Sequence, residues 1–102
     1  MSNQPNRLKM NKLQLETLQS LEEAMFNAEL MMANAEGAIE TLQTHLLREI
    51  DEKNFCSTPH ERFEAGLSIA RLRDRIIEER QKVTKAIQLR NAIARVMETI
   101  TQ

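Results

Sequence analysis

The feature that most constrains this chain is a heptad repeat in its N-terminal half. Apolar residues recur at alternating spacings of three and four from Leu18 to Leu46, so they lie on one stripe of a helix over four repeats. Such a stripe is typical of a helix that packs lengthwise against another helix. Its members are Leu18, Leu21, Met25, Ala28, Met32, Ala35, Ile39, Leu42 and Leu46.

A second stripe with the same spacing runs through the C-terminal half. Two of its positions are charged, and its members are Ile69, Leu72, Ile76, Glu79, Val83, Ala86, Arg90, Ile93, Met97 and Ile100. With two Gly, two Pro, three Phe and no Trp or Tyr in 102 residues, the chain has few turn residues and little material for a sheet or a thick core. The sequence therefore predicts an all-α fold of two long helices.

The stretch between the stripes has the signature of a corner. Thr58 is suited to cap a helix, Pro59 to occupy its first position and Glu61 to complete a capping box with Thr58. A short connection between two long helices makes them antiparallel, so we expect a coiled-coil-like helical hairpin. Its expected limits are a flexible segment at 1–11, with Asn11 as the first cap, and one domain at 12–102, with helices at about 12–52 and 59–101 and a turn at about 53–58.

A turn centred at residues 55 to 56 predicts which residues face each other across the hairpin. Apolar residues then meet apolar residues along the stripes, and on one flank acidic residues of the first helix meet arginines of the second. The expected pairs include Leu42 with Ile69, Ala35 with Ile76, Glu36 with Arg73, and Glu29 with Arg80. Exposed ion pairs contribute only about 0.3–0.5 kcal/mol each, so these would select the orientation more than stabilise the hairpin.

The chain carries more large apolar side chains than two stripes can bury. We predict a partner interface formed by Phe26, Leu30, Leu47, Phe63, Ile77, Leu89 and Val96. Covering a few of these side chains contributes several kcal/mol at about 25 cal/mol per Å² of apolar surface. Association into a homodimeric four-helix bundle is the simplest way to cover them, and a groove on a larger protein is the alternative.

One flank of the second helix is basic and has no acidic residues opposite. It consists of Arg71, Arg75, Lys82 and Lys85, which face Ala24, Met31 and Ala38. Doubled in a dimer, this stripe could follow a phosphate backbone, so RNA or DNA binding is the alternative function. Glu78 within the stripe, a formal net charge of −1 and the scarcity of aromatic residues for stacking favour a solvated or protein-binding flank instead.

The residue types that carry chemistry do not form a recognisable site. Cys56 precedes His60 by four residues, but a nucleophile needs a base and an orienting group, and two ligands are too few for zinc. The spacing of His45 and Glu49, repeated in His60 and Glu64, indicates surface ion pairs. Phosphate-binding glycine loops and hydrolase motifs are absent from the sequence. We expect no catalytic residues, no cofactor and no metal.

The sequence also bears on location and function. One Cys cannot form an internal disulfide and no secretion signal is visible, so we expect a cytoplasmic protein. Apolar runs of three or four residues are far shorter than the roughly 20 residues of a membrane span, so we expect no membrane partner. The predicted function is a non-enzymatic protein-binding module, such as a small assembly chaperone, adaptor or inhibitor, acting through the outer face of an oligomeric bundle.

Overall fold

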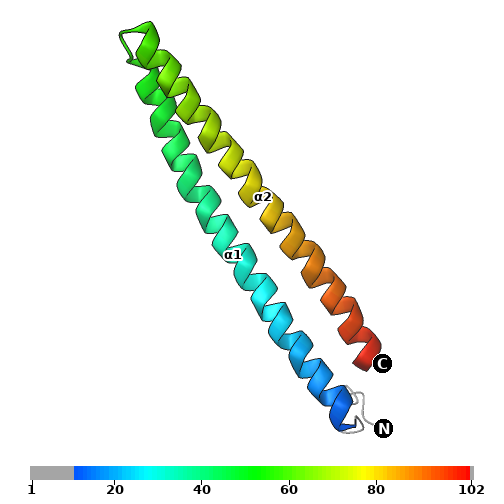
Figure 1. The fold of residues 1–102 in the computed structure, drawn as a ribbon. Coiled ribbons are helices and arrows are strands. Elements are labelled where there is room, and N and C mark those ends of the chain that lie inside the picture. Colours follow the sequence, from blue (N-terminus) through cyan, green and yellow to red (C-terminus); the bar gives the residue numbers. More distant parts are fainter. Residues whose placement is uncertain (1–10, 102) are drawn as a thin grey trace.

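The computed structural model describes residues 11–101, which form the predicted all-α antiparallel hairpin (Figure 1). Helix α1, Lys12–Asn54, and helix α2, Pro59–Thr101, lie side by side and are joined by a short segment at one end. The molecule is a rod of 76 × 19 × 15 Å. Helix α1 ends two residues later than expected, and α2 has the expected limits. The flexibility predicted for the N-terminal segment falls, apart from Asn11, outside the described residues.

Helix α1 begins directly after its N-cap residue, Asn11. The Asn11 side chain accepts a hydrogen bond from the Gln14 N–H at 2.8 Å, and the Gln14 side chain accepts one from the Asn11 N–H at 3.1 Å. This reciprocal arrangement is a capping box, which satisfies two backbone donors that the helix itself leaves without partners. The predicted cap at Asn11 is confirmed, and the contribution of Gln14 was not foreseen.

The corner follows the prediction with one difference. Thr58 Oγ1 accepts a hydrogen bond from the Glu61 N–H at 3.1 Å, so Thr58 caps α2 as expected. The Glu61 carboxylate does not close the box on the Thr58 N–H but accepts from the Ser57 N–H at 3.2 Å. It also lies 3.5 Å from the Ser57 hydroxyl oxygen. A carboxylate placed between two donors of Ser57 gains both contacts, which accounts for the shift by one residue.

The two stripes form the contact between the helices, as predicted. Every residue of both stripes is buried or half-buried. Of the two charged members, Glu79 accepts a hydrogen bond from Lys82 Nζ at 2.9 Å, so its charge is partnered within its own helix. Away from the turn the most buried positions include Ala28, Ala35 and Ala86. Their small side chains let the two helices approach closely.

The register of the hairpin differs from the prediction. The main core cluster joins Leu42 to Leu72 and Ile76, with Ile39 and Leu46 packed against it. The expected partner of Leu42, Ile69, lies outside this cluster, so Leu42 packs about one turn further along α2. The connection is centred one residue later than assumed. In addition, Cα–Cβ bonds tilt toward each helix N-terminus, which moves α1 side chains away from the turn and α2 side chains toward it.

The change of register removes the expected ion pairs. Within residues 11–101, Arg73 forms no ion pair with Glu36, and Arg80 forms none with Glu29. Arg73 lies instead beside Gln43 and Ile50 of α1. These two predicted ion pairs were wrong because they assumed the alignment of the helices that follows from a turn centred at residues 55 to 56.

Candidate protein-binding surfaces

Large apolar side chains remain uncovered along both helices. The seven residues of the predicted interface are all at least 47% exposed in the single chain: Phe26, Leu30, Leu47, Phe63, Ile77, Leu89 and Val96. Four others are exposed as well, namely Leu13, Met31, Phe55 and Leu67. Sequence reasoning did not include these four in the interface, although the place of Met31 beside the stripe was a usable signal. The hairpin thus leaves much apolar surface in contact with solvent.

Most of the exposed side chains lie on two broad faces, one on each side of the contact between the helices, whereas helical spacing places Leu30 and Leu67 on the outer edges of the rod, opposite that contact. We call the first the Arg73 face. It carries Phe26, Glu36, Glu40, Leu47 and Ile50 of α1, with Phe63, Arg73, Ile77, Arg80 and Ile87 of α2. Its large apolar residues gather near the turn and again at Phe26 and Ile87, and the charged residues lie between these two groups together with Ile77.

Near the turn the Arg73 face is hollowed between the helices. One hollow of roughly 260 Å³ is lined by Gln43, Leu46, Arg73, Ile76, Ile77 and Arg80. The adjoining hollow, of roughly 330 Å³, is lined by Ile50, Lys53, Asn54, Gly66, Ile69, Ala70 and Arg73. Arg73 lines both hollows, which combine apolar side chains with this arginine in an open depression between the helices. Such a depression suits an apolar side chain from another helix.

The charged residues named on the Arg73 face form no close ion pairs among residues 11–101. Within the described part of the chain, neither Arg73 nor Arg80 makes an ion pair, and the same holds for Glu36 and Glu40. Water solvates these groups while the face is open. Covering the face would bury these charges, which is costly unless each gains a partner of opposite sign.

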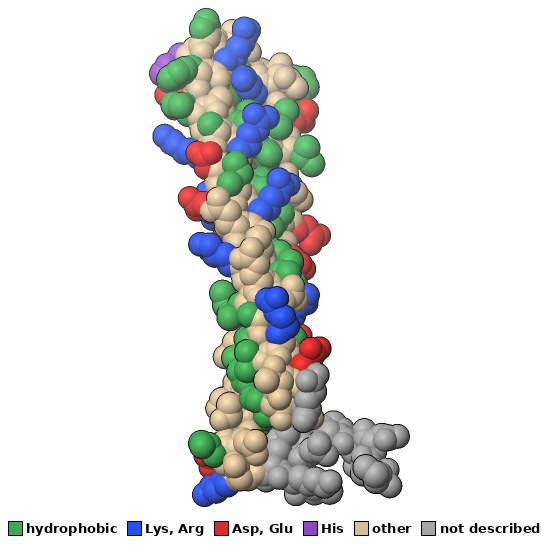
Figure 2. Space-filling model, turned by 90° about the vertical axis from the view of Figure 1, so that its right-hand side faces the viewer, with side chains coloured by type: hydrophobic (Ala, Val, Ile, Leu, Met, Phe, Trp, Pro, Cys, Tyr) green, Lys and Arg blue, Asp and Glu red, His purple; other side chains and the backbone are tan. Residues whose placement is uncertain are grey.

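The opposite side of the hairpin, the Met31 face, has a different character. It carries Ala24, Met31 and Ala38 of α1 with Leu89 and Val96 of α2. Toward the turn the α2 edge of this face continues as the basic stripe. When α2 faces the viewer, most Lys and Arg side chains lie in the half of the rod near the turn (Figure 2). The Met31 face therefore divides into a neutral half near the chain ends and a basic half near the turn.

The basic stripe is less free than predicted. Lys82, for which the sequence suggested no acidic partner across the hairpin, has one within its own helix, because it pairs with Glu79 at 2.9 Å. The reason is that Glu79, although a member of the seam, directs its carboxylate to the flank of its own helix. Arg71, Arg75 and Lys85 are exposed and make no ion pair within residues 11–101.

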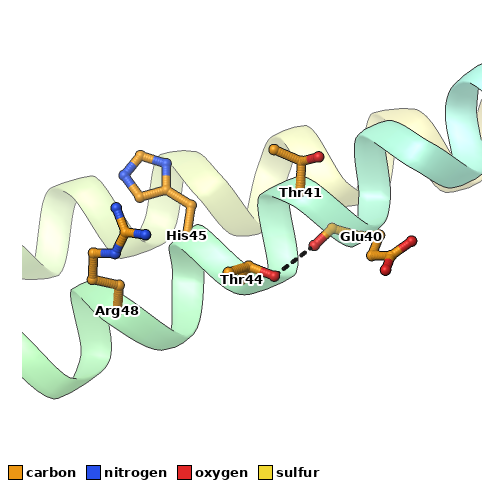
Figure 3. Close-up of a pocket in the computed structure, with 5 residues that line it drawn as sticks. All are labelled: Glu40, Thr41, Thr44, His45 and Arg48. Atoms are coloured by element: carbon orange, nitrogen blue, oxygen red, sulfur yellow. Dashed lines mark hydrogen bonds between the residues drawn. The ribbon is translucent and has the colours of Figure 1, made fainter.

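A shallow depression on α1 brings together several polar side chains but does not organise them. Its residues are Glu40, Thr41, Thr44, His45 and Arg48, all from one helix (Figure 3). The hydrogen bond among them runs from Thr44 Oγ1 to the backbone carbonyl of Glu40 at 3.1 Å. The Glu40 carboxylate points away from His45 and Arg48 (Figure 3). Polar groups that do not converge cannot hold a small ligand by several contacts.

The Cys56 and His60 side chains engage their own helices rather than each other. Cys56 Sγ donates to the Glu52 carbonyl at 3.4 Å, and His60 Nε2 lies 3.9 Å from Glu64 Oε1. The pair of His45 and Glu49 is similar, at 3.4 Å. Over residues 11–101, no group of three or more His, Cys, Asp or Glu side chains is placed to hold a metal ion.

Comparison with known proteins finds no matching family model, no similar curated protein and no similar solved structure. Evidence about function therefore comes from the two faces and their side chains. Among the described helices, neither combines the length and the apolar character that crossing a bilayer requires.

Proposed function

We propose that this protein is a non-enzymatic protein-binding module, of the kind used as small assembly chaperones, adaptors or inhibitors. The observation that carries the proposal is the exposure of large apolar side chains on both broad faces of the hairpin. Covering a half-exposed Leu, Ile or Phe contributes about 1 to 2 kcal/mol, so three or four of them on one face provide enough free energy for stable association.

The shape of the hairpin supports this role. A rod that is only two helices wide leaves both broad faces open to solvent along its length. The surface of an amphipathic helix is a common recognition element for grooves and for other helices. With two apolar faces, the rod has room for two partners, a second copy and a larger protein. The single cysteine fits a reducing compartment, so the cytoplasm is the proposed setting.

The proposal is tested by co-purification from native extract with matched variants. Because the chain has no Trp or Tyr, absorbance in the Trp and Tyr band under its gel-filtration peak reports a companion molecule, and gel electrophoresis of the peak shows whether it is a protein. Met31→Glu with Leu89→Glu adds two charges to the Met31 face and should release the companion. The control, Gln81→Glu with Gln88→Glu, adds the same charge to exposed polar positions of α2 and should retain it. A companion that tolerates both variants, and equivalent changes on the Arg73 face, would contradict the proposal.

A second candidate function is nucleic-acid binding by the basic stripe. The observation that favours it is the exposure of Arg71, Arg75 and Lys85 without ion pairs in the described part of the chain. Phosphate binding weakens steeply between about 50 and 200 mM salt, whereas an apolar protein interface does not. A salt-sensitive complex that contains nucleic acid and is lost in Arg71→Gln with Arg75→Gln would favour this function over protein binding.

A further inference from the structure

We propose that the Arg73 face is the interface between two copies of this chain, packed as a four-helix bundle with both turns at the same end. The inference rests on the proposed function, since it assumes that the outer faces bind helices. It goes further by naming the occupant of one face and the orientation of that occupant. The evidence is the distribution of charge and apolar side chains along the face.

The core contacts show which residues of the two helices lie level with each other. Leu42 packs with Leu72 and Ile76. Because the helices are antiparallel, residues that precede Leu42 in α1 lie level with residues that follow these two in α2. Glu36 and Glu40 then lie within about one turn of the level of Arg80. The acidic side chains occupy the α1 edge of the Arg73 face, and the arginines occupy the α2 edge at similar heights. The face is thus divided lengthwise into an acidic and a basic strip.

A two-fold axis parallel to the helices makes this face complementary to itself. Such an axis sets α1 of one copy on α2 of the other and preserves the level of every residue. Glu36 and Glu40 of one copy then lie opposite Arg80 and Arg73 of the second copy, and each contact occurs twice. A two-fold axis perpendicular to the helices would instead pack α1 of one copy on α1 of the other, and α2 on α2. Like charges would then meet in both layers, which costs several kcal/mol.

The same orientation also brings apolar residues of one copy opposite apolar residues of the other. Leu47, which is 69% exposed, comes level with Ile69 and Ala70 of the second copy, two residues that line the hollow near the turn. Further from the turn, Phe26, which is 64% exposed, comes within about one turn of Ile87 of the second copy. A face of 76 by 19 Å also exceeds the roughly 800 Å² per partner of a standard interface.

The Met31 face lacks this self-complementarity. In the same kind of dimer its basic stripe would lie on Ala38 and Thr41 and, near the turn, on His45 and Arg48, which offer no carboxylates. The Met31 face would therefore remain available to a larger protein while the Arg73 face joins the two copies. This division gives each of the two apolar faces one occupant.

The orientation is tested with the single cysteine, which lies at the turn. A spin label on Cys56 of the otherwise unchanged protein reports the distance between the two turns by double electron–electron resonance. With the turns at the same end, labels are expected within about 30 Å, because neighbouring helices of a bundle are about 8–10 Å apart. A dimer with labels separated by nearly the 76 Å length of the rod would overturn the proposed orientation.

The charge contacts are tested by exchange. One variant combines Glu36→Arg with Glu40→Arg, and the other combines Arg73→Glu with Arg80→Glu. Each alone should dimerise with a Kd at least about a hundredfold higher, since the exchanged residues then face residues of the same charge in the second copy. An equimolar mixture should restore the dimer, because acidic strips again face basic strips. Mixing leaves each chain unchanged internally, so the restoration can come only from contacts between chains.

A control and two contrary outcomes complete the test. Arg71→Glu with Arg75→Glu makes the same change of charge on the Met31 face and should leave the dimer Kd within about threefold. A wild-type chain that stays monomeric, or a dimer insensitive to both exchanges, would overturn the inference. In either case a companion protein released by changes on the Met31 face would leave the proposed function standing. The two proposals therefore fail separately.

Discussion

Replacing Leu42 by Ala tests the core and the register together. Leu42 is 6% exposed and joins Leu72 and Ile76 in the main core cluster. Leu-to-Ala changes in cores cost about 2–5 kcal/mol through lost burial and the cavity left behind. The contact between two helices is narrow and open at its edges, so neighbours can relax into the space. We therefore expect a loss of about 2–3 kcal/mol, a large part of the roughly 5–15 kcal/mol that stabilises a protein of this kind.

The assay is urea denaturation followed by far-ultraviolet circular dichroism. All variants are compared at one protein concentration, because any association shifts the apparent stability. The matched control is Leu13→Ala, since Leu13 is 71% exposed. This control should change the free energy of unfolding by less than about 0.5 kcal/mol. A Leu42→Ala protein as stable as the control would refute the assignment of Leu42 to the core.

The register itself is tested by combining substitutions. Leu42→Ala and Leu72→Ala remove two side chains of one cluster, so their effects should depart from additivity by about 0.5–3 kcal/mol. Leu42→Ala and Ile69→Ala should add within about 0.5 kcal/mol. Coupling of Leu42 to Ile69 with none to Leu72 would refute the observed alignment and support the one expected from a turn at residues 55 to 56.

Three further substitutions probe local features by the same denaturation assay. Asn11→Ala removes the cap of α1 and should lower stability by about 0.5–2 kcal/mol, whereas Asn11→Ser should retain most of it; equal stability of the two variants would contradict the capping role. Gly37→Ala should raise stability by up to about 1 kcal/mol, because a Cβ there meets nothing within 4 Å. A loss of stability would indicate a neighbour that the single chain does not show. Ala35→Phe should destabilise the hairpin by about 1–3 kcal/mol through overpacking, since Ala35 is 4% exposed, and an unchanged Tm would argue against its place in the seam.

Local signals in the sequence were sufficient for the architecture. The alternating spacing from Leu18 to Leu46 determined which side of α1 is buried, because side-chain direction along a helix has a fixed period. Thr58 and Pro59 determined where α2 begins, since capping depends only on neighbouring backbone groups. The seven apolar residues left off the stripes were correctly predicted to lie outside the seam, and the exposure of all seven follows from that geometry.

Relations between the helices were decided by the tertiary structure. A heptad pattern states which side of each helix is buried, but it is nearly unchanged when one helix slides along the other. The alignment that joins Leu42 to Leu72 depends on the path of the four connecting residues and on the tilt of side chains. That Glu36 and Arg73 form no ion pair within residues 11–101 follows from that alignment. Periodicity belongs to one helix at a time, whereas register exists only between two helices.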